Sequence, residues 1–140
     1  RAMAKERGLV IEEIKSSEQV DFREWLHIRA WAADKEISVG GSFFGLAQHP
    51  RIVRLNSQPV EIVPEGILFM MSNKDRPGIV GHLGSVLGNH NVNIANMSLG
   101  RDREGGQALT ALNIDSVPSA DCLAELEADP DISQIRIVQF

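Results

Sequence analysis

The chain has 140 residues, of which 43% are hydrophobic, and a formal net charge of −5 at pH 7. This length and composition can bury the cores of one or two small domains. The negative charge and the lack of a dense Lys/Arg block argue against nucleic acid as a partner. No apolar run approaches the roughly 20 residues that a membrane-spanning helix needs. The single Cys122 excludes an intrachain disulfide and suits a reducing compartment, so we expect a cytoplasmic protein.

The chain opens with what looks like the end of a helix. Residues 2–7 fit a last helical turn, and Gly8 is a suitable residue to stop it. We therefore expect this chain to have been cut from a longer protein. Apolar and polar residues then alternate over residues 25–32, which predicts a strand with one buried face, and residues 33–36 fit a hairpin turn.

The rest of the first half is also expected to be β-structure. A strand over residues 37–44 contains the glycine pair 40–41, which indicates a bulge or sharp bend. Strands 51–55 and 60–63 flank a short polar segment and form a second hairpin. Residues 64–66, Pro-Glu-Gly, are then expected to link this region to the next.

The second half has the pattern strand, helix, strand, strand, helix, strand. The expected elements are a strand at 67–71, a helix from Pro77 to about His90, strands at 92–99 and 107–115, a helix at 119–128 capped by Ser119, and a strand at 132–140. This order predicts a ferredoxin-like βαββαβ unit, an antiparallel sheet with both helices on one side. The fold class is α+β, with a β-rich domain at 1–65 and a ferredoxin-like domain at 66–140.

The first helix of this unit carries an apolar stripe and a flank of glycines. At about 100° per residue one stripe contains Ile79, Val80, Leu83, Val86 and Leu87. Three glycines, at positions 81, 84 and 88, line its flank. Each costs roughly 1 kcal/mol relative to alanine, which suggests that another backbone packs close to them.

The sequence contains no recognisable catalytic motif. It lacks the G-x-S-x-G, P-loop and G-x-G-x-x-G patterns. Its histidines, at positions 27, 49, 82 and 90, do not have the spacing of a metal pair on a helix. We therefore expect neither catalytic residues nor a metal within this chain.

The junction between strand 67–71 and the following helix favours binding of a small zwitterion. Backbone N–H groups at a helix start can hold a carboxylate, here those near Pro77, Gly78, Ile79 and Val80. The Asp75 carboxylate could accept hydrogen bonds from an ammonium group. Asn93 could hold the ligand from across the loop, and Asn73 adds a polar contact. Alternative roles stay open, with Asp75 as a helix cap or turn residue and Asn93 as a turn residue.

Two sets of motifs carry a resemblance to a known family. The segments Lys74-Asp75-Arg76-Pro77-Gly78, Asn91 to Met97, and Gly100-Arg101 followed by Gly105-Gly106 resemble an ACT domain, a regulatory module that binds amino acids. The segments 4–8, 41–45, 50–53 and 63–66 resemble the intervening domain of the long-form D-3-phosphoglycerate dehydrogenase family. The resemblance thus covers nearly the whole chain.

The resemblance implies a regulatory fragment of an NAD-dependent oxidoreductase that commits carbon to L-serine synthesis. In that family L-serine binds between two ACT domains of a homo-oligomer and inhibits the catalytic domains upstream. Asp75 and Asn93 match ligand-binding positions, and Asn73 matches one that varies.

The intervening domain of the family can also bind an anion. Arg51 matches one of its basic positions, and His49 and Arg54 could compensate for Val63, which stands at a second. Two alternatives for the whole fragment stay open, a regulatory region of an L-serine dehydratase and a dimerisation module that binds no effector.

Overall fold

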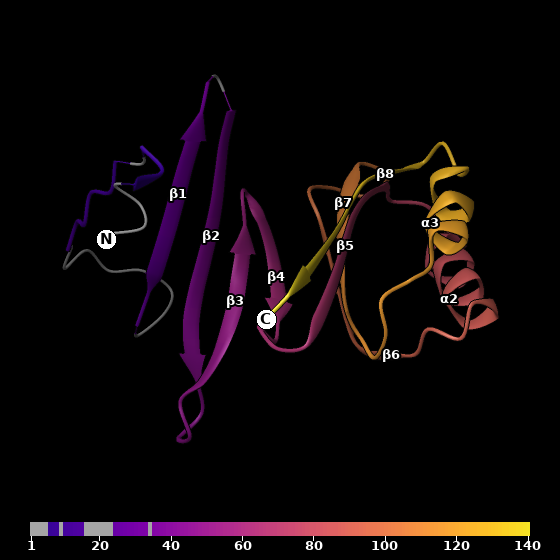
Figure 1. The fold of residues 1–140 in the computed structure, drawn as a ribbon, viewed down its shortest axis with the longest axis horizontal. Helices are drawn as coiled ribbons and strands as arrows, with labels where there is room; N and C mark the ends of the chain where they lie inside the picture. Colours follow the sequence, from indigo (N-terminus) through magenta and orange to yellow (C-terminus); the bar gives the residue numbers. More distant parts are fainter. Residues whose placement is uncertain (1–5, 9, 16–23, 34) are drawn as a thin grey trace.

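The computed structural model describes residues 6–8, 10–15, 24–33 and 35–140. They form two four-stranded antiparallel sheets, and two helices cover one face of the second sheet (Figure 1). The α+β class predicted from the sequence is confirmed. The helix expected at 2–7 lies mostly outside the described residues, but Gly8 has the positive φ of a helix-ending glycine, +67°.

The first sheet contains four strands in sequential order. They are β1 (Leu26–Ala32), β2 (Lys35–Phe44), β3 (His49–Leu55) and β4 (Gln58–Ile62). The register between β2 and β3 shifts between Gly40 and Gly41, which confirms the predicted bulge. A Cβ at Gly40 would overlap the Trp25 ring, so any other residue here would displace that ring.

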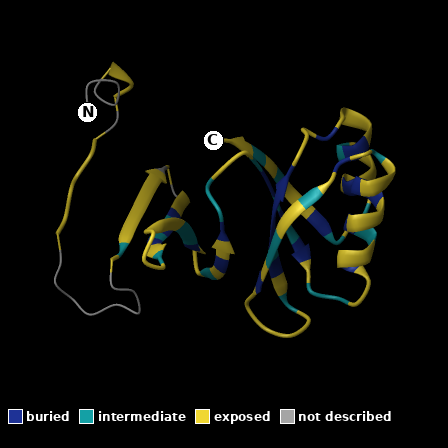
Figure 2. Cartoon of the chain, turned by 90° about the horizontal axis from the view of Figure 1, so that it is seen from below, coloured by how far each residue is buried: buried dark blue, intermediate teal, exposed yellow. Residues whose placement is uncertain are grey.

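The prediction that β1 has one buried face is wrong for the described residues. Leu26 is 65% exposed and Ile28 is 57% exposed on one face, and Trp31 on the other face is 65% exposed. Figure 2 shows β1 in the colour of exposed residues, whereas the other strands of this sheet carry buried and intermediate residues as well. The physical reason is that the buried cluster between the two sheets is built on β4, at the other edge of this sheet, so no described layer covers β1.

The second sheet has the strand order β6-β7-β5-β8 with all neighbours antiparallel. Its elements are β5 (Ile67–Lys74), α2 (Ile79–Asn89), β6 (Ile94–Arg101), β7 (Gln107–Ile114), α3 (Ala120–Glu127) and β8 (Ile132–Gln139). Both helices lie on the same side of the sheet (Figure 1). This arrangement confirms the predicted ferredoxin-like unit.

The core of this unit lies between the helices and the sheet. Its fully buried members include Phe69, Leu87, Leu112 and Leu126, each 0% exposed. The apolar stripe of α2 contributes as predicted, with one exception. Val80 is 46% exposed and does not belong to the core.

The start and the glycine flank of α2 also differ from expectation. The helix begins at Ile79 rather than Pro77, because Gly78 has φ +88° and is not helical. Apart from neighbouring residues and backbone of α2 itself, no described heavy atom lies within 4 Å of a Cβ built on the flanking glycines, at positions 81, 84 and 88. The expected close packing of another backbone is therefore wrong within the described part of this chain.

The first sheet packs on the face of the second sheet that the helices leave open. Val60 and Ile62 of β4 form a buried cluster with Leu68 and Ala111. A Cβ at Gly100 would overlap the Pro59 carbonyl oxygen, so β4 and β6 approach closely at that point. The segment between the sheets is also fixed, since the Asn113 side-chain amide donates to the carbonyls of residues 63 and 65, each at 3.0 Å.

Candidate ligand-binding loop of the second sheet

Three connections meet at one end of the second sheet. The β5–α2 loop, residues 75–78, follows the end of β5, where Lys74 pairs with Gln107 at the start of β7. Because β5 and β7 are antiparallel, the β6–β7 hairpin lies at the same end. The α3–β8 turn arrives there too, since the Lys74 N–H donates to the Asp131 carbonyl at 2.9 Å.

Asp75 is held by the β6–β7 hairpin. Its Oδ2 accepts hydrogen bonds from Arg101 Nη1 at 2.8 Å and from the Gly105 N–H at 3.1 Å. Its own N–H donates to the Gly106 carbonyl at 2.9 Å. The hydrogen bond from Arg101, followed by that from Gly105, lowers the pKa of Asp75. The carboxyl group is therefore ionised at neutral pH and can attract a cation.

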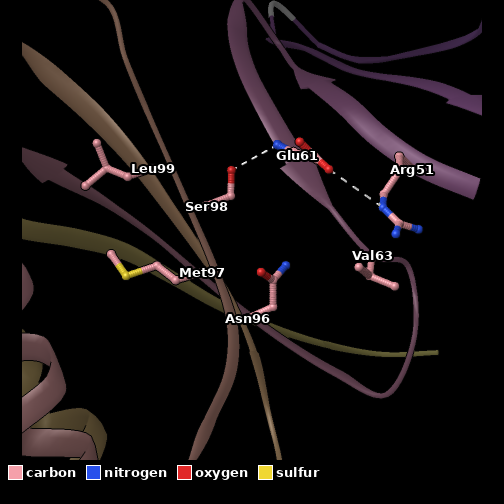
Figure 3. Close-up of a pocket in the computed structure, with 7 residues that line it drawn as sticks. All are labelled: Arg51, Glu61, Val63, Asn96, Met97, Ser98 and Leu99. Atoms are coloured by element: carbon pink, nitrogen blue, oxygen red, sulfur yellow. Dashed lines mark hydrogen bonds and ion pairs between the residues drawn. The ribbon is translucent and has the colours of Figure 1, made fainter. Parts of the chain in front are cut away.

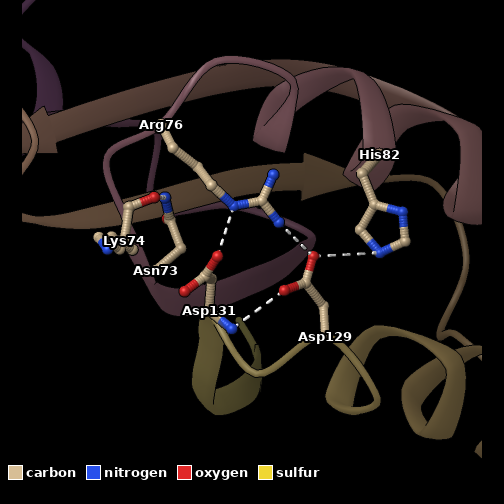
Figure 4. Close-up of polar contacts among 6 residues, drawn as sticks. All are labelled: Asn73, Lys74, Arg76, His82, Asp129 and Asp131. Carbon is tan, nitrogen blue, oxygen red and sulfur yellow. Dashed lines mark hydrogen bonds and ion pairs between the residues drawn. The ribbon is translucent and has the colours of Figure 1, made fainter.

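Arg76 points to the α3–β8 turn on the other side of the loop (Figure 4). Its Nε donates to Asp131, and its Nη2 donates to Asp129 Oδ2 at 2.7 Å. The Asp131 N–H, which donates to Asp129 Oδ1 at 3.0 Å, and then Arg76 lower the pKa of Asp129. His82 Nε2 lies 3.8 Å from Asp129 Oδ2. Asp75 and Arg76 thus fix the loop between two neighbouring connections.

The N-terminus of α2 is left without a side-chain cap among the described residues. Gly78 occupies the N-cap position in the left-handed region, and the first turn contains no acidic residue. The first N–H groups of a helix lack intrahelical acceptors and carry the positive end of its dipole. Here the Ile79 N–H makes a long hydrogen bond to the Arg76 carbonyl at 3.4 Å. An anion of carboxylate size can satisfy the N–H groups that remain and compete for this one.

Asn73 is a buried residue. It is 1% exposed, its Oδ1 accepts from Thr110 Oγ1 at 2.8 Å, and its Nδ2 donates to the Lys74 carbonyl at 3.1 Å. These contacts join the ends of β5 and β7. A ligand could reach this side chain only if the hydrogen bonds rearranged.

Asn93 lies at the opposite end of the sheet from Asp75. It precedes β6, whose first residue Ile94 pairs with Ile114, whereas Lys74 at the loop end of β5 pairs with Gln107. These two positions are seven residues apart along β7, about 23 Å at 3.3 Å per residue. The Asn93 Nδ2 donates to Asp115 Oδ2 at 2.8 Å. One chain therefore does not bring Asp75 and Asn93 to the same small ligand.

The predicted basic residues of β3 do not converge. His49 is exposed at the start of the strand, and the Arg54 guanidinium lies over the Trp25 ring at 5.6 Å. Arg51 alone lines an open pocket of about 470 Å³ between β3, β4 and β6. Figure 3 shows it facing Glu61, whose Oε1 lies 4.0 Å from Arg51 Nε. The Glu61 N–H in turn donates to Ser98 Oγ at 2.9 Å.

Sequence reasoning missed the partners that fix the loop, Arg101, Asp129 and Asp131. Arg101 belongs to the Gly100-Arg101 motif, but its contact with Asp75 depends on strand register. The ferredoxin-like topology contains that signal, because it places the β5–α2 loop and the β6–β7 hairpin at one sheet end. Once this topology is known, an acidic residue in the β5–α2 loop and a basic residue at the β6–β7 hairpin become candidates for an ion pair.

The described residues contain no cluster of three or more His, Cys, Asp or Glu side chains able to hold a metal ion. None of the helices that the structure describes is long and apolar enough to cross a membrane.

Comparison with known proteins agrees with this geometry. Residues 67–131 match the ACT domain family. This part of the chain is an ACT domain. The chain is also similar, over most of its length, to proteins named D-3-phosphoglycerate dehydrogenase.

Three of these relatives illustrate the extent of the similarity. The protein from Archaeoglobus fulgidus is 33% identical over 90% of this chain and 24% of its own length. The Synechocystis protein is 34% identical over 88% of this chain and 22% of its own. The Mycobacterium bovis protein is 32% identical over 99% of this chain and 26% of its own. The chain spans about a quarter of the length of these curated relatives.

Proposed function

We propose that this chain is the regulatory region of a D-3-phosphoglycerate dehydrogenase, the NAD-dependent enzyme that begins L-serine synthesis from 3-phosphoglycerate. Relatives of that name align with nearly the whole chain, which supports this enzyme over an L-serine dehydratase. The NAD site and the catalytic residues would belong to other parts of the parent protein, in the cytoplasm. The sequence of this chain has no G-x-G-x-x-G fingerprint for the dinucleotide.

The proposed effector is L-serine or a similar amino acid, bound at the β5–α2 loop. The observation that carries this proposal is the pairing of an uncapped helix start with an ionised carboxylate, Asp75, on the same loop. The N–H groups of Gly78, Ile79 and Val80 would hold the effector carboxylate, and Asp75 would accept from its ammonium. Pro77 has no N–H and contributes a fixed φ to the loop.

The site is proposed to be completed by a second copy of the ACT domain. In a twofold interface residue i of one copy meets residue j of the other, and the converse also holds. Two copies placed side by side and antiparallel would bring the loop of each to Asn93 of its partner. The exposed Val80 and the open glycine flank of α2 leave a smooth surface that supports such close pairing.

Feedback control then requires that serine bind the inhibited and active arrangements with different affinities. The same pairing without effector binding would make the chain a dimerisation module only.

Calorimetric titration of the 140-residue chain with L-serine, combined with sedimentation of the same sample, tests the proposal. We expect saturable heat at or below millimolar serine and a dimer or larger oligomer. A dimer that gives no heat at millimolar serine would leave only the dimerisation role. A monomer that binds serine would contradict the shared site.

The anion site on β3 stays a prediction. An anion at Arg51 would be repelled by Glu61, whose Oε1 lies 4.0 Å from Arg51 Nε, and Arg51 Nη1 already donates to the Pro50 carbonyl at 2.9 Å. Phosphate binding is therefore expected to be weak in the natural chain and to strengthen in Glu61→Gln. NMR titration with inorganic phosphate measures both affinities, and equal affinities would remove this pocket from consideration.

A further inference from the structure

One oxygen of the acceptor that the effector needs is already in use within the chain. Both hydrogen bonds to Asp75 Oδ2 come from the β6–β7 hairpin, one from Arg101 and one from the Gly105 N–H. The Asp75 side chain is 18% exposed, whereas that of Arg101 is 52% exposed. A half-exposed cation thus lies against a carboxylate that is itself largely enclosed.

We propose that Arg101 is an internal competitor for the ammonium group of the amino-acid effector at Asp75. The inference rests on the proposed function, because it assigns a role to Arg101 in that same site. Two cations that approach one carboxylate oxygen repel each other, and each must be taken partly out of water. The effector ammonium therefore binds Asp75 at the expense of the Arg101 contact.

The hairpin can release Arg101 without losing its own structure. Asp102 Oδ1 accepts from the N–H groups of Arg103 at 2.7 Å and Gln107 at 2.9 Å, and the Gly106 N–H donates to the Arg103 carbonyl at 3.0 Å. None of these bonds involves the Arg101 side chain. Displacement is then a rotation of one exposed side chain.

Asp75 also stays in place when Arg101 leaves. Its Oδ2 keeps the hydrogen bond from the Gly105 N–H, and its own N–H keeps the Gly106 carbonyl as acceptor. The carboxylate therefore remains oriented for the incoming ammonium. The competition lowers the affinity for the effector without deforming its site.

A competitor of this kind acts on one group of the ligand only. It opposes ligands through their ammonium group, whereas its positive charge can only favour the carboxylate, which binds at the start of α2. L-Glycerate has the shape of L-serine but a hydroxyl in place of the ammonium. Removal of Arg101 should strengthen serine binding and leave glycerate binding unimproved.

The test compares the natural chain with Arg101→Gln and with the matched control Arg103→Gln. Both variants remove one positive charge from the same hairpin, but only Arg101 contacts Asp75. Calorimetry with L-serine should show a dissociation constant about two- to fivefold lower in Arg101→Gln, the range of an exposed ion pair. Arg103→Gln should match the natural chain, and L-glycerate should show no gain in any protein.

A second readout needs no effector. Carbon-detected NMR titration of Asp75 should give a higher pKa in Arg101→Gln and an unchanged pKa in Arg103→Gln. An unchanged pKa in Arg101→Gln would show that the contact is absent in solution and would overturn the proposal. Serine binding that is unchanged or weaker in Arg101→Gln contradicts the competitor alone, whereas no serine heat in all three proteins contradicts the proposed function and the competition with it.

Discussion

The two helices of the ACT domain lie on the same face of one sheet, but they begin in different ways. At α3, Ser119 is the N-cap, its Oγ accepts from the Cys122 N–H at 3.2 Å, and Asp121 supplies an acid in the first turn. At α2, Gly78 stands at the N-cap position with no side-chain cap and no acid in the first turn. Both helices pack against the same core, so the difference is local to their starts.

The contrast separates a helix start that serves folding from one that is open to a ligand. A side-chain cap stabilises a helix by about 1 kcal/mol, and α2 does without it. Its start has no side-chain cap, the Ile79 N–H makes only a long hydrogen bond to the Arg76 carbonyl at 3.4 Å, and Asp75 lies three residues before the N-cap position in the same loop. The same backbone chemistry is satisfied internally in α3 and, on our account, by an effector in α2.

The largest expected effect is the loss of L-serine affinity when the acidic residue before α2 is removed, compared with removal of the acidic residue in the first turn of α3. Asp75→Ala should weaken L-serine binding by about tenfold or more, because it removes the charged acceptor of the ammonium. Asp121→Ala, the matched change at α3, should leave the affinity unchanged. Calorimetry of both variants checks this, and equal affinities would remove Asp75 from the site.

Substitution of the N-cap residues comes next in size. Gly78→Ala places a Cβ on a residue with φ +88° and should cost about 1–2 kcal/mol of unfolding free energy. Ser119→Ala should cost about 1 kcal/mol through loss of the cap. Urea unfolding measures both costs, and serine titration separates them, because only Gly78→Ala should weaken binding. A loss of serine affinity in Ser119→Ala would show that the two helix starts do not have separate roles.

A smaller effect is expected in the bodies of the helices. Gly84→Ala fills open space on α2 and should raise the unfolding free energy of the single chain by about 0.5–1 kcal/mol. Ala124→Gly, at an exposed position of α3, should lower it by a similar amount. If the glycine flank packs against a second copy, Gly84→Ala should also weaken dimer formation in sedimentation. A dimer of unchanged strength would place the interface elsewhere.

The smallest expected effect is a change in how the melting temperature depends on pH below about pH 4. The pKa values of Asp75 and Asp129 are lowered in the folded state, so the unfolded chain binds more protons between the folded and unfolded values. Their contribution to stability is complete above the unfolded pKa of about 4 and is lost as pH falls through the folded values. The melting temperature should therefore decline below about pH 4, and less steeply in Arg76→Gln. An equal slope in both proteins would show that the Arg76 contacts do not lower the pKa of Asp129 in solution.

Much of the ACT fold could be predicted from sequence because its local signals agree with its tertiary structure. The apolar strand at β5, the Ser119 cap and the order of elements all indicated what the structure contains. The exposure of β1 and Val80 could not be predicted, because periodicity shows which residues share a face but not whether another layer covers it.

The sequence predicted which polar residues belong to the loop and what chemical groups they offer, but it did not predict which residues they contact. Asp75 was recognised as an acceptor, but its pairing with Arg101 depends on a register that spans 26 residues of sequence. Asn73 was expected at the ligand, whereas burial and its bond to Thr110 depend on the pairing of β5 with β7. Long-range pairing of this kind cannot be read from local patterns.

The most direct measurement is amide NMR of the 140-residue chain during titration with L-serine. The account predicts saturable shifts for the amides of Gly78, Ile79 and Val80 at the start of α2, and for Asn93 at the far end of the sheet. The amides of Asp121 and Cys122 at the start of α3 should stay fixed. Shifts at α3 with none at α2, or no shifts at all at millimolar serine, would contradict the account.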